Sequence, residues 1–434
     1  MKLKFNYNTP GLFCIFAMPI VLKSLVSSIL NPYVNDDQVS GYVHPRFLNV
    51  LEAFRRNFGE GLEREGAAFA VYYKGEEIIN LWGGYADKEA GRKWKQNTKG
   101  IMFSATKAIS SIVIGVMVDR GILRYEDKVV DFWPAYGKYG KNETTIEDVL
   151  SHKAGLPYLT DHISIEDVKN VSKVLEKVEN TIPAWTPGTA SGYHAVTFGF
   201  ILDGIVRHAD PKRRDVKTFF EEEIAKPNDL DISIGAKIEE APFLARVTTP
   251  SLWEFTRDII KDPKILIMLH LMYMRFDDLI SKMRNNPDWL LVNYDTIVLN
   301  DPEIVSLNLA AVTGVGTAHD IARLFSMIAQ SELISNRTLD EISQPTLNSW
   351  HLEKVTIWPV VKGHGFFYEK HPFLPNTFTF GHPGYGGQFV HVDPATGLSV
   401  AYLANGLKTG TGELCGPYMR LLREVYHSIR PDFN

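Results

Sequence analysis

The sequence has only two cysteines, Cys14 and Cys415, among its 434 residues. Two cysteines cannot build a disulfide framework, a zinc ribbon or a Cys-x-x-Cys redox pair. The thirteen histidines include no His-Glu-x-x-His or His-x-His arrangement, and neither a Gly-x-Gly-x-x-Gly stretch nor a P-loop occurs. We therefore expect no metal ion, no nucleotide and no other cofactor.

The chain also lacks a surplus of either charge. It carries 46 Lys and Arg against 51 Asp and Glu, a net charge of −5, with no block of like charges. Without a basic stripe there is nothing to contact phosphates, so we expect no nucleic-acid partner. Apolar residues make up 45% of the chain, which is ample for a large core in one big domain or two.

The first 44 residues differ from the rest. The apolar run Leu12–Leu22 has 11 residues, which suits a signal-peptide core but is short for a membrane-spanning helix. Counting past Lys23 gives about 19 residues with one charge, a marginal signal anchor; the alternative is an apolar extension with little structure. We expect residues 1–44 to target or anchor the protein, making it secreted or membrane-associated through this segment, and otherwise intracellular.

Hydrophobic periodicity predicts the elements of the remaining chain. A helix over 45–64 precedes two strands within 67–87, which turn at Lys74-Gly75. A wide apolar stripe predicts a helix over 103–121, and the pattern is then mostly helical from about 127 to 330.

Strands return near the C-terminus, before a final helix over 417–429. The stretch "GQFVHVDPATGLSVAYLAN" reads as a hairpin that turns at 393–397. Strands at both ends with helices between predict an α+β domain over 45–430. We expect one antiparallel sheet built from both chain ends and flanked by helices, with an all-helical region inserted over about 127–330.

Ser104 and Lys107 stand at the start of the 103–121 helix. Residues three apart share a helix face, and a helix N-terminus favours a developing anion. A buried, neutral lysine could take the proton of the serine, as in the Ser-x-x-Lys acyl-transfer enzymes. Alone the pattern is weak, since a solvated helix start explains it equally well.

Two later segments add candidate residues. In "WTPGTASGYHAVTFGFI", Tyr193 follows a Pro-Gly turn and precedes a helix, where a tyrosine is usually a packing residue. In "FTFGHPGYGGQ", His382 and Gly384 lie on a predicted strand followed by Tyr385 and two glycines. Glycine-rich strand edges let a ligand approach the backbone, although a bulged strand would also explain them.

Together and in this order, these segments resemble the serine β-lactamase and penicillin-binding-protein-like hydrolases. The resemblance is nearest to class C β-lactamases, family VIII carboxylesterases and animal β-lactamase-like proteins. "TTIEDVLSHKAGLP" and "AAVTGVGTAHDIARLF" are similar to two further motifs of that superfamily, and the likeness runs from about Pro45 to the C-terminus.

The resemblance implies a role for each matching residue. Ser104 would be the nucleophile, Lys107 the lysine that activates it, and Tyr193 the tyrosine that relays the proton to the leaving group. His382 and Gly384 would match the ends of the Lys-Thr-Gly strand motif. The backbone N–H of Tyr385, with that of Ser104, would complete an oxyanion hole.

Two positions depart from the superfamily pattern. Ala195 stands where an asparagine usually binds a substrate amide, and His382 replaces the strand lysine that usually helps to bind a substrate carboxylate. Both changes favour an esterase, or a peptidase of unusual specificity, over a true β-lactamase. We expect the substrate to be a small-molecule or peptide acyl compound.

The stretch over about 247–302 also departs from expectation, because "PKILIMLHLMYMRFDDLISKM" is apolar and rich in methionine. It could be a core helix or a cover over the helical region, or an adaptable apolar wall or lid over an acyl pocket. For the whole chain the leading hypothesis is a serine hydrolase. The alternative is a scaffold or ligand-binding protein that keeps the fold with reduced catalysis.

Overall fold

The computed structural model describes residues 39–273, 278–284, 286–290, 297–348, 351, 353–356 and 360–433. Most of the predicted targeting segment, with Cys14, lies outside the described residues. Cys415 is buried.

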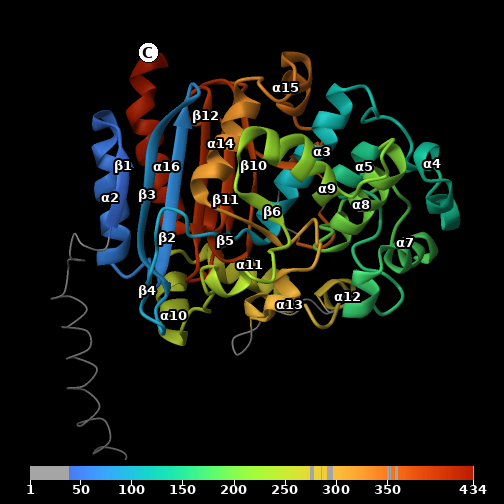
Figure 1. Cartoon of the computed structure of the whole chain (residues 1–434), viewed down its shortest axis with the longest axis horizontal. Coiled ribbons are helices and arrows are strands. Elements are labelled where there is room, and N and C mark those ends of the chain that lie inside the picture. The colour runs from blue at the N-terminus through green and yellow to red at the C-terminus, as the bar shows by residue number, and fades with distance from the viewer. Residues whose placement is uncertain are drawn as a thin grey trace, which may run out of the picture.

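One antiparallel sheet forms the centre of the molecule (Figure 1). Its strand order is β1-β3-β2-β12-β11-β10-β9-β8, with β4 paired to β3, so strands from both ends of the chain meet where β2 pairs with β12. This confirms the predicted sheet. The strands are β1 (Val39–Val43), β2 (Gly66–Tyr73), β3 (Glu76–Asp87), β4 (Arg92–Lys93), β8 (Val361–Gly363), β9 (Phe366–Lys370), β10 (Phe378–Pro383), β11 (Phe389–Asp393) and β12 (Leu398–Ala404).

The sheet begins earlier than the predicted domain boundary at residue 45. Strand β1 pairs with β3 in the register Val39↔Gly83 to Val43↔Ile79. It is a short edge strand with a glycine at its middle and three exposed residues, so its sequence carries no clear alternation of apolar and polar side chains.

The predicted hairpin between β2 and β3 is present, and the backbone of its turn accounts for a glycine at position 75. Lys74 and Gly75 both have positive φ, 53° and 84°. This conformation matches the twist of a two-residue hairpin and favours glycine at one of the two positions.

Helices cover both faces of the sheet. Helices α2 (Leu48–Gly59) and α16 (Gly416–Ile429) pack on one face, against side chains such as Phe69, Val71 and Val400. On the other face lie α3 (Thr106–Asp119) and α14 (Ala318–Ala329). The alternation along β2 assigns Ala68, Ala70 and Tyr72 to this second face.

The predicted all-helical insertion is correct in outline and differs in two details. Helix α14, expected within it, packs on the main sheet instead. Two strands of the region, β6 (Ile232–Ile234) and β7 (Gly314–Gly316), also form a small sheet with β5 (Gly100–Ile101), in the order β5-β7-β6. Strands of two or three residues are too short for any periodicity to reveal them.

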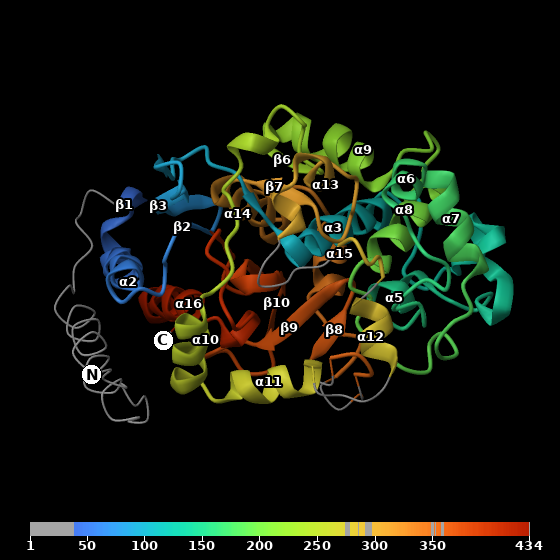
Figure 2. The same ribbon diagram turned by 90° about the horizontal axis from the view of Figure 1, so that it is seen from below.

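The helices of that region form the right half of Figure 1. They are α4 (Val129–Phe132), α5 (Ile146–Leu150), α6 (Ile165–Lys169), α7 (Val171–Asn180), α8 (Thr197–Ala209), α9 (Val216–Phe220), α12 (Asp278–Arg284) and α13 (Pro302–Val305). Helix α15 (Asn336–Ile342) follows the region. The 247–302 stretch also contributes α10 (Leu252–Lys261) and α11 (Lys264–Tyr273), which the view from below shows along one edge (Figure 2).

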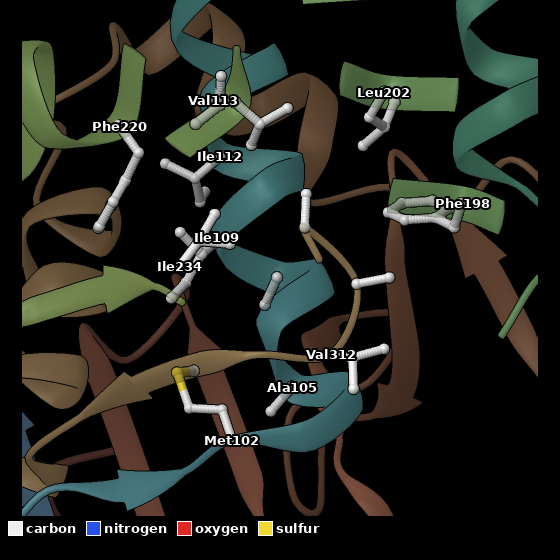
Figure 3. Packing of buried hydrophobic residues seen from close by; sticks show 14 of the residues in the cluster. Met102, Ala105, Ile109, Ile112, Val113, Phe198, Leu202, Phe220, Ile234 and Val312 are labelled. Carbon is white, nitrogen blue, oxygen red and sulfur yellow. The ribbon is translucent and has the colours of Figure 1, made fainter. Parts of the chain in front are cut away.

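Helix α3 is buried along nearly its whole length between the sheet and the helical region. Figure 3 shows Ile109, Ile112 and Val113 of α3 packed among residues of other elements, including Phe198, Phe220 and Ile234. Burial on all sides fixes the position of its N-terminus firmly. Among the described residues, no helix is both long and apolar enough to cross a membrane.

Candidate active site

Ser104 lies in the 3-10 turn Phe103–Ala105 that leads into α3. It is partly exposed, whereas its neighbours on both sides are buried. Phe103 has a φ of 50°, a left-handed conformation that costs free energy for a residue with a bulky side chain. The strained residue before Ser104 and the helix after it present the serine hydroxyl at a fixed and accessible point.

Lys107 is fully buried one turn further along α3. Its Nζ donates to Ser104 Oγ at 3.4 Å, to the Ala195 carbonyl at 2.7 Å and to the Ala311 carbonyl at 3.1 Å. These partners are neutral oxygens, and burial lowers the pKa of Lys107 well below its ordinary value. The amine beside the serine is therefore held in a setting that favours its neutral form.

Tyr193 approaches Ser104 from the loop before α8. Its phenol ring lies 4.9 Å from Lys107 Nζ, and its hydroxyl hydrogen-bonds the Ser104 side chain. Burial raises the pKa of Tyr193, and the hydrogen bond with Ser104 offsets only part of that rise. Of the two groups beside Ser104, the lysine is thus the one that can lose its proton, and the tyrosine keeps its own.

The "SHKAGLP" motif supports the loop that carries Tyr193. His152 accepts from Gly192 N through its carbonyl at 3.0 Å and from His194 N through Nδ1 at 3.2 Å. Its ring packs edge-on against the Tyr193 ring, with the centroids 5.0 Å apart. The motif therefore holds the backbone on both sides of Tyr193 and packs against its ring.

The "GVGTAHD" motif holds the start of α3. Gly314 N donates to Thr106 Oγ1 at 2.9 Å, and Met102 N donates to the Gly314 carbonyl at 2.8 Å. A Cβ at Gly314 would lie only 2.6 Å from Thr106 Oγ1, so this approach requires glycine.

A buried ion pair beside Tyr193 was not predicted from the sequence. Glu353 and Lys362 are each 1% exposed, with Oε1 and Nζ 3.4 Å apart. Glu353 accepts from Tyr193 N, and Lys362 Nζ donates to Ser191 Oγ at 3.2 Å. Burial alone would raise the pKa of Glu353, yet the Lys362 charge and hydrogen bonds from Thr356 and Tyr193 keep it below its ordinary value. The pair therefore anchors the backbone of the Tyr193 loop.

Glu353→Gln should destabilise the protein strongly. It leaves the buried Lys362 charge without a counter-charge, and such a change costs about 3–5 kcal/mol. The measurement is the free energy of unfolding in urea. The double variant Glu353→Gln/Lys362→Met removes both charges and should recover most of the loss. A Glu353→Gln protein as stable as wild type would show that the pair is not coupled.

His382 lies on β10 with its side chain 1% exposed, and its ring stacks on Phe367 at 4.6 Å. Nδ1 donates to the Pro383 carbonyl at 2.7 Å, which leaves the lone pair on Nε2. Nε2 is buried and has no hydrogen-bond partner in the described residues. Burial lowers the pKa of His382 to about 3. The group near Tyr193 is thus a neutral acceptor, where the superfamily pattern has a cation.

Gly384 and Tyr385 complete the sequence-predicted set. A Cβ at Gly384 would lie 2.3 Å from the Met102 carbonyl, so only glycine allows the end of β10 to pass so close to the segment before Ser104. The Tyr385 side chain is 42% exposed and its ring lies 6.0 Å from that of Phe103. The structure therefore gathers all six predicted site residues around the start of α3. The oxyanion role expected of Tyr385 N–H stays a prediction.

Within the described ranges, no group of three or more His, Cys, Asp or Glu side chains is placed to hold a metal ion. A hydroxyl, a buried amine with a lowered pKa and a phenol with a raised pKa converge at a helix start, and such a set is suited to acyl transfer.

Comparison with known proteins shows which family the chain belongs to. Residues 54–424 match the family model described as Beta-lactamase. The chain is 29% identical over 377 residues to the esterase/beta-lactamase LipL of Mycobacterium tuberculosis, covering 85% of this chain and 83% of that protein.

Two solved structures share the fold over 90% of the chain. A family VIII carboxylesterase has a TM-score of 0.78 and 26% identity, with all of its chain covered. A penicillin-binding-protein homologue from Caulobacter crescentus has a TM-score of 0.75 and 28% identity, with 99% covered. Fold, motif order and sequence similarity together show that this chain belongs to the beta-lactamase family of serine hydrolase-type enzymes.

Proposed function

We propose that this protein is a carboxylesterase-type serine hydrolase that forms an acyl-enzyme at Ser104. The observation that carries the proposal is the fully buried Lys107, whose Nζ lies 3.4 Å from Ser104 Oγ among neutral oxygens. A solvated helix start would not bury an amine in this way. The relationship to an esterase/beta-lactamase and a family VIII carboxylesterase supports the same activity.

The proposed reaction has two halves. Lys107 takes the Ser104 proton while Oγ bonds to the substrate carbonyl carbon, and negative charge develops on the carbonyl oxygen. The carbon–oxygen bond to the alcohol then breaks, and the leaving alkoxide takes a proton through Tyr193, which Lys107 resupplies. Water next attacks the acyl-enzyme in the same manner and releases the acid and Ser104.

Two neutral positions favour an uncharged ester over an acidic lactam or peptide. Ala195 offers its carbonyl to Lys107 and only a methyl group as its side chain. The His382 pKa of about 3 keeps the imidazole neutral. The unpaired lone pair on Nε2 would therefore repel a substrate carboxylate. A peptidase with an uncharged substrate is the second candidate, since the same acylation machinery would serve an amide.

His382→Lys should shift specificity toward carboxylate-bearing substrates. A charge-assisted hydrogen bond contributes about 1.5–3 kcal/mol, so the kcat/KM for a cephalosporin relative to p-nitrophenyl acetate should rise about 10- to 100-fold. His382→Gln, which is neutral, is the matched control. An equal ratio in both variants, or a wild-type ratio near one, would contradict the specificity claim.

A fluorophosphonate probe tests the enzyme against the scaffold alternative. An active serine hydrolase should be labelled at Ser104, and peptide mapping of the labelled protein locates the adduct. A folded protein that takes up no probe would favour the scaffold or ligand-binding alternative.

We further propose, from the apolar run Leu12–Leu22, that the N-terminal segment makes the protein secreted or membrane-associated.

A further inference from the structure

Helix α10 faces the protein with its polar side. Arg257 Nη1 donates to the Gly61 carbonyl at 3.0 Å, Asp258 accepts from Thr409 Oγ1 at 2.9 Å, and Glu254 lies 3.7 Å from Arg64. Each of these polar residues is partly buried against the body of the molecule. This orientation is the reverse of a normal surface helix, whose apolar stripe faces the core.

The apolar side of α10 faces solvent. Leu252 is 79% exposed, Trp253 62% and Ile260 71%, and α11 continues the surface with Leu266 at 55% and Ile267 at 56%. We call these five residues the α10–α11 apolar face. An exposed apolar face with tryptophan and leucine is typical of helices that lie in the interface of a bilayer.

Three charged residues lie at the junction of α10 and α11 beside this face. Asp262 is partly buried, and its side chain accepts from Lys264 N at 3.0 Å. Lys261 and Lys264, at the junction of α10 and α11, are both exposed. The acidic side chains Glu254 and Asp258 are paired with arginine on the protein side of the helix. The exposed charges at this junction are therefore the two lysines, which suit an anionic surface.

The N-terminal segment joins the fold at the same end of the molecule. Val39 pairs with Gly83. The adjacent Gly84 lies against Phe58, near the end of α2, since a Cβ added at Gly84 would lie 2.8 Å from the Phe58 ring. Helix α10 is bonded to Gly61 and Arg64, which follow this end of α2. Figure 1 shows α10 at the lower left. The described chain therefore begins, at Val39, at the same end of the molecule as helix α10.

We propose that the α10–α11 apolar face lies on an anionic lipid bilayer and sets the orientation of the enzyme on it. Leucine and tryptophan side chains enter the interface, and the two lysines contact anionic headgroups. This contact is separate from any anchoring by the N-terminal segment and does not depend on the catalytic residues.

The first test is co-sedimentation of the full chain with vesicles of phosphatidylcholine containing phosphatidylglycerol. Leu252→Glu and Leu266→Glu should each weaken binding about tenfold or more, because burying a leucine contributes a corresponding free energy. Leu48→Glu is the matched control, because Leu48 is an exposed leucine, 52% accessible, at the opposite end of α2. This variant should bind vesicles like wild type. Equal binding by all three variants and wild type would overturn the proposal.

The second test uses tryptophan fluorescence to separate this face from the N-terminal segment. The first tryptophan of the chain is Trp82, so residues 1–44 contribute no tryptophan signal. Brominated phosphatidylcholine should quench the fluorescence of bound wild-type protein, and Trp253→Phe should lose most of that quenching. Lys261→Gln and Lys264→Gln should each weaken binding to anionic vesicles about fivefold. Vesicle binding without quenching of Trp253 would mean that another segment alone contacts lipid.

Two controls address the other occupants of the face. Sedimentation velocity without lipid should give the same oligomeric state for wild type and Leu252→Glu. A dimer that Leu252→Glu dissociates would assign the face to a second copy of the chain. Because the chain has eight tryptophans, Trp253→Phe is the reference: without vesicles, acrylamide should quench wild type more strongly than this variant. Equal quenching of the two would mean that part of this chain covers the face. Either result overturns the proposal.

Discussion

Ser104→Ala should lower kcat/KM for p-nitrophenyl acetate by about 10⁴-fold or more, because removal of a nucleophile from a cooperative set abolishes the covalent route. Ser104 is partly exposed, so loss of its hydroxyl leaves no large cavity and the protein should unfold at the wild-type temperature. The measurement is ester hydrolysis under saturating and subsaturating substrate, together with thermal unfolding followed by circular dichroism.

Ser110→Ala is the control for that experiment. Ser110 lies on the same helix, and its buried hydroxyl donates to the Ala310 carbonyl. It should cost stability through the lost hydrogen bond while fluorophosphonate labelling of Ser104 persists. Wild-type turnover by Ser104→Ala would remove Ser104 from the role of nucleophile and, with it, the proposed acyl-enzyme.

The parts of the site that lie close together in the chain were predictable from sequence. The three-residue spacing of Ser104 and Lys107 alone puts them on one helix face. In the structure, Ser104 Oγ and Lys107 Nζ lie 3.4 Å apart. Tyr193 and His382 needed the resemblance to a known superfamily, because nothing local ties either residue to Ser104. The hairpins and the long helices followed from periodicity and turn residues.

The Glu353–Lys362 pair shows why the rest was not predictable. Glu353 accepts from Tyr193, which is 160 positions away, and the stretch around it has no periodic pattern. Charged residues are usually exposed, so sequence alone places both on the surface. Only the folded backbone brings them together as a buried pair beside the site.

Helix α10 shows a different limit. Its sequence predicts a helix with one apolar and one polar side, but periodicity cannot say which side faces the protein. For 247–302 the sequence leaves open a core helix, a cover over the helical region, or an apolar wall or lid over an acyl pocket. The structure turns Leu252 and Trp253 outward because Arg257 and Asp258 bond to the body of the molecule.

Lys107→Arg should reduce kcat/KM about 10³-fold, since a guanidinium cannot give up its proton and a general base contributes about 10²–10⁴-fold. Wild-type kcat/KM should rise with pH through the lowered pKa of Lys107 as the amine becomes neutral. Activity should stay high up to pH 10, because the raised pKa of Tyr193 keeps the phenol protonated there. A Lys107→Arg variant that keeps more than a tenth of wild-type activity would exclude lysine as the base.

Lys107→Met separates catalysis from stability at the same position. The unfolded chain keeps the ordinary lysine pKa of 10.5, while burial lowers the folded value, so the unfolded state binds more protons between the two. The wild-type free energy of unfolding should therefore increase with pH across that window, and Lys107→Met should flatten the increase. Because methionine is apolar and of similar length, the variant should be inactive yet more stable than wild type near pH 7. A loss of stability in Lys107→Met would show that the lysine is kept for its hydrogen bonds to Ala195 and Ala311, and not for its proton.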